Sequence, residues 1–125
     1  MIAITINTEP LPQSRPRFGN GKVYETTALR KYKSAVALVA QRQMAGLKPL
    51  TGALQCGLKF YRNFNETSRR FGDFDNLAKA VIDALNGIAF VDDSQITKCV
   101  IEKIRSERPR VEIWIDELKP PLQEG

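Results

Sequence analysis

The 125-residue sequence contains no histidine, and this absence removes several classes of catalytic site at once. Histidine is the base of Ser-His-Asp and Cys-His enzymes and a common metal ligand, so no centre of these kinds is expected. The two cysteines, Cys56 and Cys99, are too few for a structural zinc site, which usually needs four Cys or His ligands. They make no disulfide framework either, and we expect both to be small buried core residues in a reducing compartment.

Long apolar segments are also missing. No stretch approaches 18 consecutive apolar residues, so the sequence predicts no membrane span and no membrane partner. The first ten residues, MIAITINTEP, have neither a basic start nor a long apolar run, and we expect no signal peptide. With 42% hydrophobic and 26% charged residues the composition is that of a globular protein, and the length favours one domain over residues 1–125. These features predict a cytoplasmic protein.

Basic residues are concentrated in the first part of the chain. The formal net charge is +5, but residues 1–50 alone carry +6 and the remaining residues carry −1. The basic residues of that first part are Arg15, Arg17, Lys22, Arg30, Lys31, Lys33, Arg42 and Lys48. Charge alone leaves two interpretations open, namely a surface for a nucleic acid and an ordinary solvated helix face.

Hydrophobic periodicity predicts both strands and helices. Alternation of apolar and polar residues predicts strands, and apolar spacings of three and four predict helices. The prolines and glycines of residues 8–24 predict a long irregular loop. Strands are expected at 2–7, 53–61, 96–104 and 110–116, and helices from Thr26 or Thr27 to about 45 and from 73 to about 86. The order β-α-β-α-β-β indicates an α+β fold, with a small mixed sheet of about four strands and two main helices.

The same periodicities assign single side chains to the core or to the surface. In the first helix Val36 falls on the core face and Lys33 on the solvent face. In the last strand Trp114 falls on the polar face, opposite Ile113 and Ile115. An aromatic residue in this position either marks an interface or packs under a helix, and the sequence leaves both open.

The segment GDFDNLAK, residues 72–79, is the most informative one for chemistry. Asp73 and Asp75 lie at the start of the second helix, and the pair Asp92-Asp93 follows that helix after a short turn. If the chain doubles back, these carboxylates share one pocket, and a divalent cation must then offset their repulsion. Oxygen ligands alone favour Mg²⁺, Mn²⁺ or Ca²⁺. The alternative is structural, because Asp73 is also a good N-cap, Asp75 favours the helix dipole and Asp92-Asp93 can start a turn.

Lys79 lies one helical turn after Asp75 and shares its face. The pair is either an ordinary ion pair or a carboxylate ligand beside a cation that is aimed at a phosphate. Asp83, a further turn on, is expected to pair with Lys79 or with water. In a basic chain, carboxylate-held Mg²⁺ suggests hydrolysis of phosphodiesters.

Residues 73–96, within GDFDNLAKAVIDALNGIAFVDDSQI, closely resemble the signature of RusA-type Holliday junction resolvases of bacteria and their prophages. That family shows D-x-D-N-x-x-K, an apolar helix with Asp-Ala-Leu, a short turn and then Asp-Asp followed by Gln, Val or Ile. The loop ending in RPRFGNGKVY also resembles the arginine-proline segment of many members. The order of strands and helices is the same, so the resemblance spans most of the chain.

This resemblance implies an enzyme, a crossover junction endodeoxyribonuclease that acts as a Mg²⁺-dependent homodimer on four-way DNA junctions in recombination and repair. Carried over, Asp73, Asp75 and Asp93 are the catalytic and metal-binding residues, Lys79 is the essential lysine, and Asp92 is the first residue of the Asp-Asp pair. Independently of the family, two symmetric nicks in one junction require two sites, which a two-fold dimer of a small chain supplies.

Basic residues near the acidic motif are candidates for contact with DNA. We expect Arg69 and Arg70, and a second cluster of Arg15, Arg17 and Lys22, to contact phosphates, the alternative being solvated loop charges. A restriction-type nuclease is disfavoured, since it carries acid-x-lysine on a strand. A nuclease for other branched DNA and a non-catalytic nucleic-acid-binding protein stay open as functions.

Overall fold

A computed structural model describes residues 1–14, 17–19, 22–63 and 72–118 of the chain. Its main sheet has four strands in the order β1-β6-β4-β5. The strands are β1 (Ile2–Ile6), β4 (Leu54–Arg62), β5 (Ile96–Arg105) and β6 (Arg110–Glu117). β4 and β5 are parallel, whereas β6 runs antiparallel to both β1 and β4, so the sheet is mixed.

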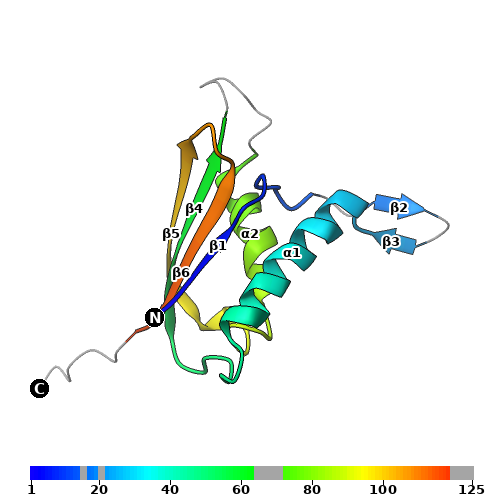
Figure 1. The fold of residues 1–125 in the computed structure, drawn as a ribbon. Coiled ribbons are helices and arrows are strands. Elements are labelled where there is room, and N and C mark those ends of the chain that lie inside the picture. The colour runs from blue at the N-terminus through cyan, green and yellow to red at the C-terminus, as the bar shows by residue number, and fades with distance from the viewer. Residues whose placement is uncertain (15–16, 20–21, 64–71, 119–125) are drawn as a thin grey trace, which may run out of the picture.

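Two helices lie together on one side of this sheet (Figure 1). They are α1 (Thr27–Gln43) and α2 (Phe74–Leu85), and the short 3₁₀ helix η2 (Asp93–Gln95) leads directly into β5. The predicted α+β class, the mixed four-stranded sheet and the order β-α-β-α-β-β are confirmed. None of the helices in the described ranges is both long and apolar enough to cross a membrane.

The core forms because every second strand residue and one face of each helix are apolar. Strand β1 shows the pattern plainly, since Ile2, Ile4 and Ile6 are buried and the residues between them are exposed. The buried residues of the other strands and of the helices are Leu54, Cys56, Leu58, Phe60, Val111, Ile113, Ile115, Leu29, Tyr32, Val36, Ala40, Leu77, Val81 and Leu85. The two helices therefore cover one face of the sheet and leave the other face open.

The prediction of an irregular loop over residues 8–24 is wrong in part. The segment contains a two-stranded ladder of β2 (Arg17–Gly19) and β3 (Lys22–Tyr24), in which Arg17 pairs with Tyr24 and Gly19 with Lys22. All the prolines of this segment precede residue 17, so they restrict only its first part. The Asn-Gly dipeptide at 20–21 favours a hairpin, but the prolines of the segment led to the prediction of a loop.

Trp114 lies on the open face of the sheet and not under a helix. A Cβ atom added to Gly57 of β4 would lie 1.8 Å from Nε1 of Trp114, so the indole rests directly on the glycine backbone. Residues 57 and 114 are register partners on β4 and β6. Only glycine leaves room for the indole here, and the hollow beside Trp114 on the open face is lined by Thr5, Lys59 and Glu112 as well as by apolar residues.

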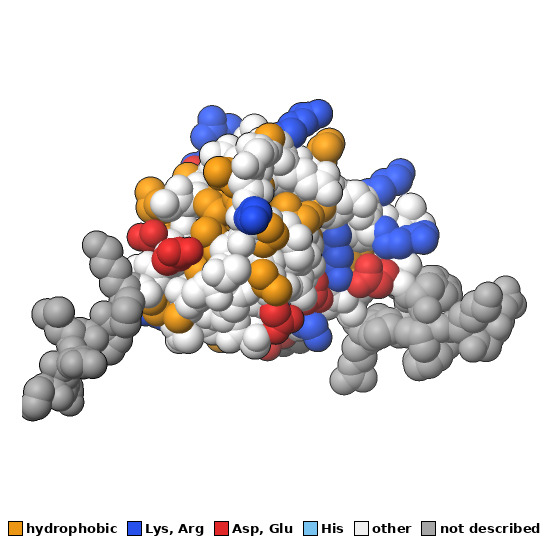
Figure 2. Space-filling view, turned by 90° about the horizontal axis from the view of Figure 1, so that it is seen from below, with side chains coloured by type: hydrophobic (Ala, Val, Ile, Leu, Met, Phe, Trp, Pro, Cys, Tyr) orange, Lys and Arg blue, Asp and Glu red, His pale blue; other side chains and the backbone are white. Residues whose placement is uncertain are grey.

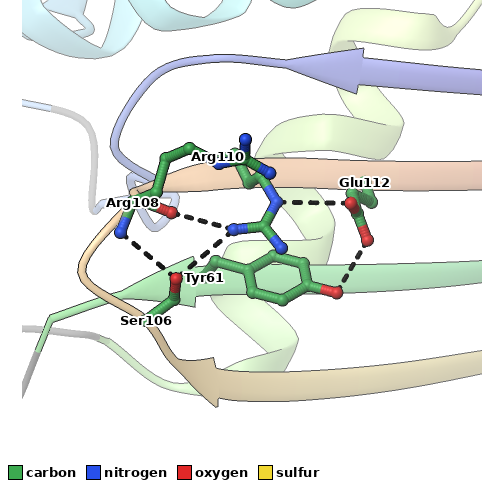
Figure 3. Close-up of polar contacts among 5 residues, drawn as sticks. All are labelled: Tyr61, Ser106, Arg108, Arg110 and Glu112. Atoms are coloured by element: carbon green, nitrogen blue, oxygen red, sulfur yellow. Dashed lines mark hydrogen bonds and ion pairs between the residues drawn. The ribbon is translucent and has the colours of Figure 1, made fainter.

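A polar network fixes one end of the open face (Figure 3). The hydroxyl of Tyr61 donates a hydrogen bond of 2.7 Å to Glu112, whose other oxygen accepts one of 3.2 Å from Nε of Arg110. The guanidinium of Arg110 also stacks on Tyr61, 3.6 Å from the ring centre, and donates to Ser106 and to the carbonyl of Arg108. These donors lower the pKa of Glu112, and the bond to Glu112 raises the pKa of Tyr61. The turn between β5 and β6 is thereby held against β4.

The two cysteines are neighbours in space. Cys56 and Cys99 are register partners on β4 and β5, and the thiol of Cys56 donates to the sulfur of Cys99 over 3.0 Å. Cys56 is buried, as predicted, but Cys99 is only half-buried because β5 is an edge strand. Both are free thiols. The hydrogen bond and burial raise the pKa of Cys56, and the bond from Cys56 lowers the pKa of Cys99.

The end of the molecule formed by the segments α1–β4 and α2–β5 exposes hydrophobic side chains among charged ones. Seen from this end, hydrophobic groups gather in the middle together with a basic group, and further acidic and basic groups lie toward the edge (Figure 2). Leu47 and Val91, which belong to these two segments, are 63% and 59% exposed. Helix α2 begins at the opposite end of the molecule (Figure 1).

Candidate active site

The first turn of α2 is set by the residues before it. Gly72 has φ of 93°, which favours glycine, and a Cβ atom there would lie 2.8 Å from Pro12. Asp73 follows in extended conformation as the N-cap residue, but its side chain makes no cap hydrogen bond to the described backbone. Asp73 thus occupies the N-cap position, as the sequence suggested. Its carboxylate, however, is exposed and accepts no capping hydrogen bond from the described backbone.

A hollow of about 370 Å³ collects the main candidate residues between α2 and the segment that begins with η2. Asp75 and Lys79 contribute from α2 and Asp93 contributes from η2, so the two halves of the acidic motif meet in one place. Among the described residues, the lining consists of Asp75, Ala78, Lys79, Ile82, Asp83, Asp93 and Ile101. Asp73 is not part of this lining.

The chain returns from α2 to the pocket through a tightly bonded turn. Gly87, with φ of 81°, donates to the carbonyl of Phe90 over 2.8 Å, and Phe90 is 1% exposed. Leu50 donates to Ala89 and accepts from Val91, which fixes the returning chain on both sides of Phe90. The chain reversal that a shared pocket needs is therefore built around one buried aromatic side chain.

Asp92 and Asp93 have different surroundings although they are adjacent. Asp92 caps η2 by accepting from the backbone N–H of Ser94 at 3.2 Å, and its own N–H donates to Gln95 at 2.8 Å. Hydrogen bonds from Ser94 are the main reason that the pKa of Asp92 is lowered. The side-chain amide of Gln95 then donates to the carbonyls of Leu50 and Gly52. Asp92 thus shapes the turn, and Asp93 lines the pocket.

Lys79 is exposed on α2 and lines the pocket. Its ammonium forms no salt bridge within 4.0 Å with any residue of the described ranges, so the ordinary ion pair with Asp75 is not formed. Asp75 instead accepts from the backbone N–H of Asn76 at 2.9 Å. The positive charge in the pocket is therefore not engaged by the carboxylate one turn away.

Lys33 of α1 is an element of the site that sequence reasoning missed. It was expected on the solvent face, but its side chain is only 17% exposed. Its ammonium lies 2.7 Å from Glu25 and 3.6 Å from Asp83, which lines the pocket. Asp83 therefore pairs with Lys33, whereas the sequence predicted Lys79 or water as its partner. The sequence around Lys33 gives no signal of its contact with Asp83, because Asp83 lies on another helix.

The acidic side chains are spread along the pocket. Among the described residues no three His, Cys, Asp or Glu side chains are close enough together to hold one metal ion. The donor set is nevertheless the one that Mg²⁺ and Mn²⁺ prefer, because all candidates are carboxylate oxygens. One or two carboxylates suffice for Mg²⁺ where water and substrate phosphates supply the other ligands.

Two of the predicted DNA-contacting residues fall on the short hairpin. Arg17 is the first residue of β2 and Lys22 the first residue of β3. The other three, Arg15, Arg69 and Arg70, lie outside the described residues.

The endodeoxyribonuclease RusA family matches residues 7–116, which include the hairpin, both helices and every pocket residue. The chain belongs to the RusA endodeoxyribonuclease family. RusA membership supports a DNA-binding endonuclease of the Holliday junction resolvase type, with a place in recombination. The chain is also 33% identical to the uncharacterized protein YqaN of Bacillus subtilis (strain 168), over 94% of this chain and 96% of that protein. The resemblance drawn from residues 73–96 is thus confirmed as a RusA relationship over most of the chain.

Proposed function

We propose that this protein is a Mg²⁺-dependent crossover junction endodeoxyribonuclease, which resolves four-way DNA junctions by paired symmetric nicks in cytoplasmic recombination and repair. The observation that carries the proposal is the shared pocket of Asp75, Lys79 and Asp93, which brings two parts of the family signature together. Mn²⁺ fits the same donors. When bound, the cation supplies an activated water and stabilises charge on the phosphodiester.

Asp73, Asp75 and Asp93 are proposed to supply the ligands, and the three carboxylates must draw closer together than in this structure to share one cation. Asp75 and Asp93 line the pocket, and Asp73 stands at the start of the same helix with an exposed carboxylate. Asp92 holds the turn that presents Asp93, because it caps η2. Lys79 places an ammonium group in the same pocket, where it can offset the negative charge that develops on a phosphate during cleavage.

The basic residues of the chain are proposed to bind the DNA backbone. Arg17 and Lys22 belong to the β2–β3 hairpin, and Arg15, Arg69 and Arg70 complete the two predicted clusters. Each phosphate contact releases counterions, so binding weakens with salt. Charge reversal within a cluster is expected to weaken junction binding and to flatten its salt dependence, and an unchanged slope of affinity against salt contradicts that cluster.

A homodimer is the proposed assembly. Two symmetric nicks require two pockets, and the open sheet face with Trp114 over Gly57 is the proposed surface for self-association, since it presents an aromatic residue that no helix covers. Light scattering is expected to give about twice the chain mass of 14.1 kDa. Mixed dimers of wild-type and Asp75→Asn chains should nick one strand and rarely complete resolution. A stable monomer that still makes paired nicks contradicts the symmetric mechanism.

The function is tested with a synthetic four-way junction, with and without Mg²⁺ or Mn²⁺. We expect two symmetric nicks only when the metal is present, with a linear duplex and a flap as comparison substrates. Equal cleavage of the flap indicates a nuclease for branched DNA in general. Binding without cleavage under every metal condition indicates the non-catalytic alternative.

A further inference from the structure

Phe74 is unusual among the phenylalanines that the structure describes. Of the three phenylalanines whose side chains the structure describes, Phe60 and Phe90 are 0% and 1% exposed, whereas Phe74 is 59% exposed. A single exposed apolar side chain is common and needs no explanation by itself. The position of Phe74 suggests a function for its exposed ring, because Phe74 stands between the two site carboxylates Asp73 and Asp75.

The backbone that carries Phe74 is held on both sides. Before it, Gly72 packs closely against Pro12, and the carbonyl of Gly72 accepts a hydrogen bond of 3.1 Å from the ammonium of Lys103. After it, the carbonyl of Asn76 accepts a hydrogen bond of 2.8 Å from the backbone N–H of Gln13. The ring is therefore displayed from a fixed helix start, and little ordering is needed when a ligand binds it.

The charges around Phe74 restrict what its ring can contact. Asp73 and Asp75 are both exposed beside it, and centres of protein–protein interfaces are depleted of charged residues. An anionic membrane surface is equally unsuited to two carboxylates. A nucleobase fits, because its flat face is apolar and its attached phosphate is the group that a cation at these carboxylates attracts.

We infer that Phe74 is a stacking residue, which receives the face of an unpaired or unstacked base at the branch point of the DNA substrate. The inference rests on the proposed function, since a junction exposes base faces at its crossover while a continuous duplex stacks them on each other. Stacking accepts any base because every base has an aromatic face. Phe74 would therefore select DNA by its branched structure and not by its sequence.

The test compares binding of a four-way junction with binding of a linear duplex of equal length, both without metal so that no cleavage occurs. Phe74→Ala is expected to weaken junction binding about 5- to 150-fold, the usual range for loss of one stacked base. Duplex binding should change less than twofold. Phe74→Trp should preserve the preference for the junction. Leu47→Ala is the control, because Leu47 is similarly exposed at the opposite end of the molecule.

A fluorescent base analogue, 2-aminopurine, placed beside the crossover gives a second readout. Its emission should change when the wild-type protein binds and should change much less with Phe74→Ala. Phe74→Leu keeps an apolar side chain without an aromatic face, so it should behave like the alanine variant even where alanine disturbs folding. An unchanged ratio of junction to duplex affinity in both variants overturns the inference, as does a change in oligomeric mass with that ratio preserved.

These experiments distinguish failure of the stacking role from failure of the proposed nuclease function. If the wild-type protein never cleaves junctions but the alanine variant loses its junction preference, the nuclease proposal fails and the stacking role stands. If the wild-type protein cleaves with Mg²⁺ but the affinity ratio is the same in both variants, the stacking role fails alone.

Discussion

The ammonium of Lys33 on α1 lies 3.6 Å from the carboxylate of Asp83 on α2. This contact joins the two helices at the wall of the acidic pocket, since Asp83 is one of its lining residues. Lys33 also donates to Glu25 over 2.7 Å, directly after the hairpin strand β3. One lysine thus connects the hairpin, both helices and the pocket.

Lys33→Met should destabilise the fold by about 1 kcal/mol, because it leaves two carboxylates without their shared cation while keeping the apolar stem. Lys31→Met on the same helix is the control, as Lys31 is exposed. The measurement is urea unfolding at neutral pH. Equal midpoints for the two variants would show that the contact contributes nothing.

Acid should weaken the fold through Glu25. Its hydrogen bond from Lys33, followed by that from Gln13, lowers the pKa of Glu25 below the ordinary value of 4.5. A carboxylate with a lowered pKa stabilises the folded state above the unfolded pKa, and this stabilisation is lost as pH falls through the folded pKa. Unfolding measured between neutral pH and pH below 4.5 should therefore show a decline that is shallower in Glu25→Gln. An identical pH profile in the variant contradicts this assignment.

Asp73→Asn, Asp75→Asn and Asp93→Asn should each abolish metal-dependent junction cleavage while binding is retained or tightened. Each change removes a ligand charge and also reduces the repulsion of phosphates. Asp92→Asn is a matched control because asparagine caps helices about as well as aspartate. It should cleave normally. Wild-type rates in the first three variants, or a dead Asp92→Asn, would overturn the division of roles between Asp92 and Asp93.

Lys79→Ala should lose most cleavage activity without loss of stability. No salt bridge of this lysine is seen in the described part of the chain, so its removal should change the free energy of unfolding by less than about 0.5 kcal/mol. Rates on the junction and urea unfolding are measured together, and metal binding should persist. Normal cleavage by Lys79→Ala would show that Lys79 has no catalytic role and is a solvated surface residue.

Gly57→Ala should disrupt the open face of the sheet. The added Cβ would lie 1.8 Å from Trp114, so the indole must move, at a cost of about 1–3 kcal/mol. Gly52→Ala is the control, since no described atom lies within 4 Å of its added Cβ. Thermal unfolding gives the stability, and light scattering reports whether displacement of Trp114 also weakens self-association. A glycine-57 variant as stable as the control contradicts the close packing.

Local patterns predicted most of the fold. The alternation in Ile2, Ile4 and Ile6 and the helical spacing around Val36 are decided by neighbouring residues, so they are readable from the chain. The β2–β3 hairpin was missed because its signals compete within one short segment. The pairing of Cys56 with Cys99 depends on strand register, which no local pattern encodes.

The candidate site was predictable in composition but not in arrangement. The sequence identified the acidic residues and Lys79, and these became informative through their similarity to a known signature. It could not tell which of Asp92 and Asp93 caps a turn, because that depends on the hydrogen bonds of Gln95 to Leu50 and Gly52. It also could not place Lys33 beside Asp83, since helix packing brings them together.

Strands β4 and β5 are adjacent and parallel, and every described residue that lines the pocket belongs to the chain that leaves the first of them and returns as the second. Such a connection is a single uninterrupted piece of sequence. An insertion between β1 and β4, or after β5, therefore leaves the spacing of the site residues unchanged. The reacting groups can be inherited as one block while the hairpin and the outer strands diverge.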